Sequence, residues 1–292
     1  MKNSNLKISV IVLSWNTKKL LRECLKSLSA GPEIIVVDNG SFDGSPQMVK
    51  KEFPQVKLIR NRKNLGFAKG NNQGIRVATG DLMMLLNSDT IVQKGAIERL
   101  ADTLSGLGTK VAAISPLLIN QDGSVQKDPA YLRFPSLLTV LFYYNPILKS
   151  LVVRFLPQLF FSTTNFDRPT LVDQLPGAAV MIRKEILNKV GGLDEAYPLY
   201  FEDVDLCFRI KKLGYQLMVD PHSRVIHLGG KSLEPVVKKE GREKFYFLNF
   251  SSLFLFCEKN YSGFKTWLIK IIVFGHLFLG LKFGLIKALI TR

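Results

Sequence analysis

Residues 8–45 read ISVIVLSWNTKKLLRECLKSLSAGPEIIVVDNGSFDGS, with two apolar runs separated by a segment of helical periodicity. The apolar runs are residues 8–14 and 34–37, and the first is rich in β-branched residues. The helical face between them carries Leu20, Leu21, Cys24, Leu25 and Leu28. Strands that are apolar without alternation are typical of a parallel sheet buried between helices. The stretch therefore predicts a strand–helix–strand unit of an α/β protein.

The same alternation continues along the chain. Further helices are expected at residues 45–52, 66–78 and 94–106, and further strands at 56–59, 82–86 and 111–119. This order predicts a mostly parallel sheet with helices on both faces. Ligands of such sheets bind outside the carboxyl ends of the strands. The polar clusters at residues 14–17, 38–45 and 87–90 each follow an expected strand, so they are candidates for a binding site.

The C-terminal part of the chain is both basic and apolar. The whole chain has 292 residues, 47% of them hydrophobic, and a formal net charge of +16. After residue 230, eleven Lys or Arg residues accompany only four Asp or Glu residues. This combination favours an anionic membrane surface over nucleic acid as a partner.

This tail is expected to lie on a membrane rather than to cross it. Its longest uncharged stretch, residues 271–281, is shorter than the roughly 20 apolar residues that a membrane span requires. One or two interfacial helices, broken near Gly275, Gly280 or Gly284, fit this pattern. The alternative is a helix pair packed on the domain or on a second subunit, as in a homodimer.

Residues 131–161 form a second apolar segment. It is rich in Leu, Phe and Tyr, and it has no charged residue between Arg133 and Lys149. Prolines at positions 135, 146 and 157 interrupt it, so it is also too short to cross a bilayer. A lid, a docking hairpin and a buried helix pair are the alternatives.

The cysteines and the N-terminus indicate a reducing compartment. Cys24, Cys207 and Cys257 are far apart and form no CxxC motif, which argues against a disulfide framework or a zinc site. The N-terminal apolar run is too short for a signal peptide. No GxGxxG follows the first strand, and Val225 stands where a P-loop ending at Ser232 would need glycine.

Acidic side chains follow two of the expected strands. Asp89 ends the run Asn87-Ser88-Asp89, where it could hold a hard cation that also bridges diphosphate oxygens. The alternative is an Asx turn in which Asp89 caps the next helix. Asp38 opens the segment 38–45 and could accept from a ribose hydroxyl or a base N–H. The later residues of that segment are better explained as helix caps.

Glycines recur every fourth residue in the helix expected at 66–78. Gly66, Gly70 and Gly74 would form one bare stripe, although each helical glycine costs about 1 kcal/mol relative to alanine. Close approach of a ligand or of another backbone must offset that cost. Tight packing on the sheet explains Gly70 and Gly74 equally well, whereas Asn64 and Gly66, at the preceding turn, are better ligand candidates.

An acidic cluster begins the helix expected at residues 202–212. Asp203 would share a face with Leu206, Cys207 and Ile210. It is therefore expected to point inward, where burial would raise its pKa as a general base requires. Asp205 and Arg209, on the neighbouring face with Glu202, can form an ion pair. The alternative is that the acids only favour the helix N-terminus.

Six short motifs in order resemble those of the family 2 (GT-A) inverting glycosyltransferases, particularly the rhamnosyltransferase-like branch of bacterial surface polysaccharide synthesis. They are VLSWN at 12–16, VDNGSFDGS at 37–45, NLGFAKGN at 64–71, LNSDT at 86–90, PGA at 176–178 and YFEDVDL at 200–206. Each motif is weak by itself, but the order is specific. The resemblance covers about residues 7–230.

The resemblance implies a GT-A fold and a nucleoside-diphosphate sugar as donor, linked to dTDP or UDP. The donor-binding residues that it implies are Ser14, Trp15, Asn16, Asp38, Asn39, Asn64, Gly66, Lys69, Asn87 and Ser88. Gly177 and Ala178 would lie beside the acceptor.

The resemblance also implies a divalent cation, Mn²⁺ or Mg²⁺, on Asp89, with His227 as a second ligand. Judged alone, His227 is more simply explained as a structural histidine. The chain has Asn87 where many members have a first aspartate, and a neutral amide is a weaker ligand. Asp203 matches the catalytic base, with Glu202 beside it. It would take the acceptor's proton as that oxygen attacks the anomeric carbon, while the cation stabilises the leaving diphosphate.

The expected protein has a GT-A domain over residues 1–230, with a nucleotide-sugar half (1–110) and an acceptor half (111–230). A membrane-associating helical tail (231–292) follows. It would act as a peripheral protein at the cytoplasmic face of the cell membrane, on a glycan or a polyprenyl-diphosphate-linked acceptor, with no nucleic acid partner. Two rival classes are a non-catalytic sugar-nucleotide-binding membrane scaffold and a nucleotidyltransferase. The Glu202-Asp203 pair argues against the first, and the lack of a Gly-rich basic loop after the first strand argues against the second.

Overall fold

The computed structural model describes residues 6–126, 131–163, 165–229, 234–280 and 282–291. Its strands are β1 (Ile8–Ser14), β2 (Glu33–Asp38), β3 (Lys57–Arg60), β4 (Leu82–Asn87), β5 (Thr90–Val92), β6 (Val111–Ile119), β7 (Thr170–Val172), β8 (Ala179–Arg183) and β9 (Gln216–His227). Its α-helices are α1 (Lys18–Ser27), α2 (Ser45–Glu52), α3 (Phe67–Val77), α4 (Ala96–Gly106), α5 (Leu137–Tyr143), α6 (Pro146–Phe155), α7 (Lys184–Val190), α8 (Glu202–Lys212), α9 (Glu234–Asn260), α10 (Gly263–Leu279) and α11 (Phe283–Ile290). The alternation expected up to residue 119 is confirmed.

The strands of the described residues form one sheet with the order β3-β2-β1-β4-β8-β6-β9-β5, and β7 pairs with β9. β1, β2, β3, β4, β6 and β9 run in one direction, and β5, β7 and β8 run in the other. The expected mostly parallel sheet is therefore confirmed. The sequence pattern did not predict β8, which lies antiparallel between β4 and β6.

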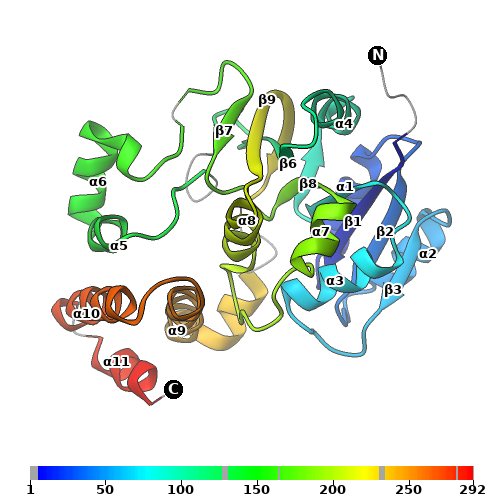
Figure 1. The fold of residues 1–292 in the computed structure, drawn as a ribbon. Coiled ribbons are helices and arrows are strands. Elements are labelled where there is room, and N and C mark those ends of the chain that lie inside the picture. The colour runs from blue at the N-terminus through cyan, green and yellow to red at the C-terminus, as the bar shows by residue number, and fades with distance from the viewer. Residues whose placement is uncertain (1–5, 127–130, 164, 230–233, 281, 292) are drawn as a thin grey trace.

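The strand order reverses beside β1. The chain adds β2 and β3 on one side of β1 and then returns to add β4 on the other side. Because crossovers between parallel strands are right-handed, α1 and α2 cover one face and α3 covers the opposite face. Figure 1 shows α3 in front of this part of the sheet. The crevice at the carboxyl ends of β1 and β4 is the position where an open α/β sheet binds its ligand.

Helix α3 lies very close to the sheet. A Cβ added to Gly70 would lie 2.4 Å from Leu13 Cδ1, and one added to Gly74 would lie 2.4 Å from Ile11 Cγ2. The packing explanation of these two glycines is confirmed, and neither requires a ligand. Gly66 differs, because its φ of +89° just before the helix is a conformation that favours glycine.

The two apolar segments of the sequence pack together at one end of the molecule. In Figure 1, α5, α6, α10 and α11 lie at the end opposite to α2 and β3. Val140 of α5, Tyr197 before α8 and residues of α9, α10 and α11 share a second hydrophobic cluster. Phe256, Ile269 and Val273 are fully buried in it. The tail thus packs on the sheet domain, which was one of the two alternatives expected from the sequence. The other alternative, contact of the tail with a membrane, stays a prediction.

The tail helices break at one of the three expected glycines. Helix α10 ends at Leu279 and is followed by Gly280, whereas Gly275 and Gly284 lie inside α10 and α11. An additional bend in α9 occurs at Gly241, where φ is +82°. Among the helices described, none combines the length and the apolar character needed to cross a bilayer.

The apolar segment at 131–161 contains the helix pair α5 and α6. This pair is only partly buried: Val140 of α5 is buried, but both helices also expose large apolar side chains. Leu138, Leu151 and Phe155 are each more than half exposed, at 54%, 51% and 67%. Tyr131 and Phe160, which flank the two helices, are buried and attach the segment to the rest of the protein.

Candidate active site

A cavity of about 1070 Å³ lies at the carboxyl ends of β1, β2 and β4. Its other walls come from α5, α8, α9 and the loops that precede β8 and α8. The candidate residues that line it are Trp15, Asn39, Asn64, Gly66, Asn87, Ser88, Gly177, Ala178, Glu202, Asp203 and His227. The fold therefore brings all six motifs and His227 to one cavity.

Ser14 and Asn16 support this cavity without lining it. The Ser14 hydroxyl is buried and lies 2.9 Å from the Thr17 hydroxyl, which lies 2.9 Å from the Ser88 hydroxyl. Asn16 has a positive φ of +54°, and its side-chain oxygen accepts a hydrogen bond of 2.9 Å from the Phe42 N–H. Their polar atoms join neighbouring loops, whereas Trp15 between them lines the cavity, and a role of the loop at residues 14–16 in holding the nucleoside stays a prediction.

Asp38 is buried at the end of β2, with only 1% of its surface exposed. Its Oδ2 accepts from the Ser41 N–H at 3.1 Å, whereas its Oδ1 has no hydrogen-bond partner within the part of the chain that is described. A buried carboxylate oxygen without a partner is costly. A ligand hydroxyl or N–H that reaches Oδ1 would remove that cost.

Asn39 and Asn64 hold the turn that leads into α3. The Asn39 amide donates to Asn64 Oδ1 at 2.9 Å and accepts from the Leu65 N–H at 3.1 Å. Both side chains therefore shape the cavity wall through contacts with each other. The Lys69 side chain is exposed on α3 and does not line the cavity, so its contact with a donor stays a prediction. The turn at Gly66 directs the first turn of α3 so that Lys69 faces solvent.

Asp89 and His227 lie side by side although they are far apart in the sequence. Antiparallel pairing of β5 with β9 places Thr90 opposite His227, and this brings His227 Nε2 to 3.5 Å from Asp89 Oδ1. Gln126 Oε1 lies 2.7 Å from His227 Nδ1. Because an amide oxygen only accepts, Nδ1 carries the proton and Nε2 faces Asp89.

Sequence reasoning did not identify Gln126. It follows a short hairpin after β6, where Ile119 pairs with Val125, and no local pattern marks it. Within the described residues no group of three or more His, Cys, Asp or Glu side chains is arranged to hold a metal ion. The protein therefore offers the Asp89–His227 pair rather than a closed cage, and a ligand would have to complete any coordination.

Glu202 and Asp203 begin α8 beside the same cavity. The two residues before them, Tyr200 and Phe201, have positive φ values of +59° and +68°, which turn the chain sharply into the helix. Asp203 Oδ2 accepts a hydrogen bond of 2.9 Å from the Gly177 N–H. A Cβ added to Gly177 would lie 3.2 Å from that oxygen, so glycine permits the close approach.

The expected orientation of Asp203 is partly wrong. Leu206, Cys207 and Ile210 are buried as predicted, but Asp203 is only half buried and faces the cavity. The more deeply buried acids are Glu202 and Asp205, with 6% and 2% exposed. The difference arises because the loop before β8 covers this side of the helix and leaves the cavity open at its first turn.

Burial and proximity raise the pKa values of the pair. Burial and, to a smaller extent, the neighbouring Asp203 carboxylate together raise the pKa of Glu202 to about 8. Burial also raises the pKa of Asp203, although the N–H groups of Gly177 and Val204 oppose this shift. Two adjacent carboxyl groups of this kind hold a proton near neutral pH, as a proton-transfer site requires.

Glu202→Gln is expected to stabilise the protein as the pH rises from 5 to 8. Between pH 4.5 and about 8 the unfolded side chain is ionised while the folded one keeps its proton, so stability of the natural protein falls with pH. Glutamine does not ionise and removes this loss. In thermal melts, the Tm of Glu202→Gln should exceed that of the natural protein by an amount that grows to at least about 5 °C by pH 8. The matched variant Glu185→Gln, at an exposed position of α7, should show no such growth; equal behaviour of the two variants would contradict the prediction.

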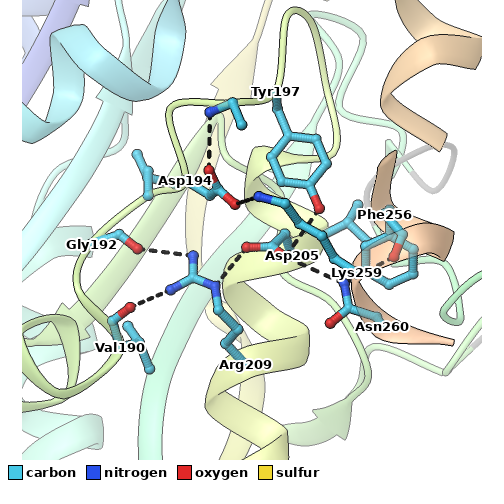
Figure 2. Close-up of polar contacts among 12 residues, drawn as sticks. Val190, Gly192, Asp194, Tyr197, Asp205, Arg209, Phe256, Lys259 and Asn260 are labelled. Atoms are coloured by element: carbon cyan, nitrogen blue, oxygen red, sulfur yellow. Dashed lines mark hydrogen bonds and ion pairs between the residues drawn. The ribbon is translucent and has the colours of Figure 1, made fainter. Parts of the chain in front are cut away.

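A polar network behind this pair attaches α8 to its surroundings (Figure 2). Arg209 Nε donates to Asp205 Oδ2 at 2.6 Å, which confirms the expected ion pair. The same guanidinium donates to the carbonyls of Val190 and Gly192 at 2.5 and 2.9 Å. The Tyr197 hydroxyl donates to Asp205 Oδ1 at 3.1 Å. The buried Asp205 charge is therefore fully partnered, and α8 is fixed to the loop before it.

The end of α9 joins the same network. Asn260 Nδ2 donates to Asp205 Oδ1 at 3.4 Å, and Lys259 Nζ forms an ion pair with Asp194 (Figure 2). The first long tail helix is thus linked to the helix that carries Glu202 and Asp203.

Comparison with known proteins identifies the family. The model described as "Glycosyl transferase family 2" matches residues 9–191. The chain is 28% identical over 242 residues to the N-acetylglucosaminyl-diphospho-decaprenol L-rhamnosyltransferase of Mycobacterium tuberculosis, covering 75% of each chain. It is 25% identical over 210 residues to the low-salt glycan biosynthesis hexosyltransferase Agl10 of Haloferax volcanii, covering 70% of this chain and 62% of that one.

Solved structures share the fold. A mannosyltransferase of Pyrobaculum calidifontis, in complex with GDP-Man and Mn²⁺, superposes with a TM-score of 0.58 at 18% identity. The match covers 88% of this chain and 65% of that one. GalNAc-T7, with UDP, GalNAc and Mn²⁺, gives a TM-score of 0.56 at 20% identity, over 76% of this chain and 43% of that one.

The reversal of strand order beside β1 and the motifs gathered at that crevice define a glycosyltransferase of the GT-A class. The family model matches more than half of the residues, and the chain belongs to glycosyl transferase family 2.

Proposed function

We propose that this enzyme transfers a hexose, with inversion, from a nucleoside diphosphate to a polyprenyl-diphosphate-linked glycan at the cytoplasmic face of the cell membrane. The observation that carries the proposal is the single cavity in which the donor motifs, the Glu202–Asp203 pair and an apolar wall share one space. A donor and a larger acceptor can meet there.

The donor would bind at the carboxyl ends of β1 and β2. Asp38 Oδ1, buried without a partner, would accept from a base N–H or a ribose hydroxyl of a thymidine or uridine nucleotide. Trp15 lines the adjacent wall, where its indole ring would stack on the base. Asn64, Asn87 and Ser88 would face the remaining polar groups of the donor.

Asp89 and His227 would hold a divalent cation, Mn²⁺ or Mg²⁺. They fit one because a carboxylate oxygen and an imidazole nitrogen face each other at 3.5 Å, and Gln126 fixes the tautomer that leaves Nε2 free to coordinate. The two solved structures named above contain Mn²⁺, which supports this assignment. When bound, the cation would neutralise charge on the leaving diphosphate.

Asp203 would act as the general base. The acceptor hydroxyl gives its proton to the Asp203 carboxylate as its oxygen forms a bond to the anomeric carbon. The bond from that carbon to the diphosphate breaks in the same displacement, so the configuration inverts. Glu202, whose pKa is raised to about 8, would keep its own proton and spare the pair a second negative charge. Gly177 orients Asp203 through its N–H, and Ala178 would lie beside the acceptor.

The acceptor would be linked to a lipid, and L-rhamnose is the leading candidate for the sugar. Both proposals draw on the name of the mycobacterial relative. The surface of α6, α10 and α11 supports contact with an anionic membrane, because it exposes both apolar side chains and cations. The exposed apolar residues are Leu151, Phe155, Phe264, Trp267, Phe278 and Ile290. The exposed cations within or next to these helices are Arg154, Lys282 and Lys287.

A thermal-shift titration with UDP and dTDP, each with Mn²⁺ and with EDTA, tests the donor site. A ligand at about 100 times its Kd adds about 2.7 kcal/mol to the free energy of unfolding. One nucleotide is expected to raise the Tm only when the metal is present. Release of free nucleoside diphosphate on adding a lipid-linked acceptor would then test turnover. A shift without turnover on any acceptor would favour the sugar-nucleotide-binding scaffold, and no shift with folded protein would contradict the donor site.

A further inference from the structure

The cavity continues beyond the catalytic residues into a space between α5 and α9. Its lining residues there are Val140, Tyr143, Tyr144, Leu248, Phe250 and Leu253, which define what we call the α5–α9 arm. The whole cavity, at about 1070 Å³, exceeds the roughly 300–1,000 Å³ that is typical of a site for one small molecule. There is therefore room for a second ligand group besides the donor.

The walls of this arm suit hydrocarbon better than sugar. Val140, Phe250 and Leu253 belong to the second hydrophobic cluster, and the rings of Tyr144 and Phe250 pack with centroids 4.9 Å apart. Val140, Leu248, Phe250 and Leu253 offer the hydroxyl groups of a glycan no hydrogen-bond partner, and burying such groups without partners is costly. A hydrocarbon chain would instead gain free energy from each apolar group that it removes from water.

Positive charge lines the same cavity next to the arm. Lys149 Nζ lies 3.9 Å from the centroid of the Tyr143 ring, and both residues line the cavity. Arg133 also lines it, with its guanidinium 3.4 Å from Asp173. An anionic group attached to one end of a hydrocarbon chain would therefore meet cations beside the apolar wall.

The outer surfaces around the arm carry apolar side chains as well. Helix α5 contacts α6 and α10, and all three lie at the same end of the molecule (Figure 1). Leu138 on α5, Phe155 on α6 and Trp267 on α10 are more than half exposed, at 54%, 67% and 56%. A lipid chain could pass from an apolar surface of this kind into the arm while staying out of water.

We propose that the α5–α9 arm binds the first isoprene units of the acceptor's polyprenyl chain, with the attached diphosphate beside Lys149. The inference rests on the proposed lipid-linked acceptor and adds the place where the enzyme recognises its lipid. The chain is then a determinant of affinity for the enzyme itself, and not only a means of holding the acceptor in the membrane.

The test uses soluble acceptor analogues in which the same diphosphate-linked sugar carries either a methyl group or a geranyl chain. The geranyl analogue should have a kcat/KM at least about tenfold higher, through a lower KM, because part of its chain is buried. Leu248→Trp fills the arm and should bring this ratio close to one. Leu107→Trp makes the same change at an exposed position after α4 and should leave the ratio as it is in the natural protein.

Equal kcat/KM values for the two analogues would overturn the proposal, and so would an unchanged ratio in folded Leu248→Trp. A second measurement avoids the variant altogether. Geranylgeranyl diphosphate should raise the Tm of the natural protein more than inorganic diphosphate does at the same concentration. Equal Tm shifts would overturn the proposal that the arm binds a lipid. If neither analogue is a substrate but geranylgeranyl diphosphate still gives the larger shift, the proposed reaction fails while the lipid site stands.

Discussion

Asp203→Asn is expected to lower kcat about 1000-fold, because asparagine cannot take the proton of the acceptor hydroxyl and a general base contributes about 100- to 10,000-fold. Asparagine has nearly the same shape, and its oxygen can still accept from the Gly177 N–H that now holds Asp203 at 2.9 Å. The fold and the nucleotide-dependent thermal shift should therefore persist. Initial rates of nucleoside diphosphate release, measured at saturating donor, give the comparison.

Glu202→Gln is the matched control for that experiment. It removes a carboxyl group from the same helical turn, but one that keeps its proton near neutral pH, so its kcat should fall much less. In the natural protein the rise of kcat/KM with pH should occur at a higher pH than an ordinary aspartate would give, because burial raises the pKa of the Asp203 base. A greater loss in Glu202→Gln than in Asp203→Asn would assign the base to Glu202 and show that our assignment is wrong.

Asp89→Asn is expected to abolish the metal-dependent part of nucleotide binding and to lower kcat at least about 100-fold. The amide keeps the shape of the side chain but loses the negative charge that would attract a divalent cation beside His227. The measurement is the Tm shift given by the nucleotide with Mn²⁺, compared with the shift in EDTA. The two values should coincide in this variant.

Gln126→Leu is expected to weaken the metal-dependent part of nucleotide binding without abolishing it. It leaves Asp89 and His227 in place but removes the oxygen 2.7 Å from His227 Nδ1, and the loss of such a contact lowers metal affinity about 10- to 100-fold. Higher Mn²⁺ concentrations should therefore restore the shift in Gln126→Leu but not in Asp89→Asn. Asp102→Asn, at an exposed position of α4, serves as the control. Full metal dependence in Asp89→Asn would place the cation elsewhere.

The N-terminal half of the fold could be predicted from the sequence because its signals are local. The apolar runs of β1, β2, β4 and β6 and the amphipathic periods of α1 and α4 agree with the structure to within a few residues. β8 could not be predicted in its place, since Ala179–Arg183 is short and its antiparallel position depends on pairing with β4 and β6 from distant parts of the chain. The packing of α9, α10 and α11 on α5 and α8 depends in the same way on contacts across the molecule.

The site shows the same division between local and distant information. Motifs at strand ends led to Trp15, Asn39 and Asn87, and the acidic cluster at the start of a helix led to the Glu202-Asp203 pair. All of these residues line the cavity. Periodicity alone placed Asp203 against the core, because it could not include the loop that brings Gly177 to this helix.

Two further residues mark the limits of sequence reasoning. Gln126 has no local signal, because its contact with His227 depends on a strand pairing between distant segments. The motif that contains Lys69 is present, but the helical turn directs this side chain to solvent.

The contacts of Lys259 and Asn260 with Asp194 and Asp205 also constrain how such enzymes can diverge. A C-terminal segment acquired from another family member would have to supply new partners for both carboxylates. Without them, the buried Asp205 would lose one of its donors directly behind the helix that carries the reacting carboxylates. Recombination that exchanges tails should therefore succeed only when the crossover lies before Val190, so that catalytic helix and tail are inherited together.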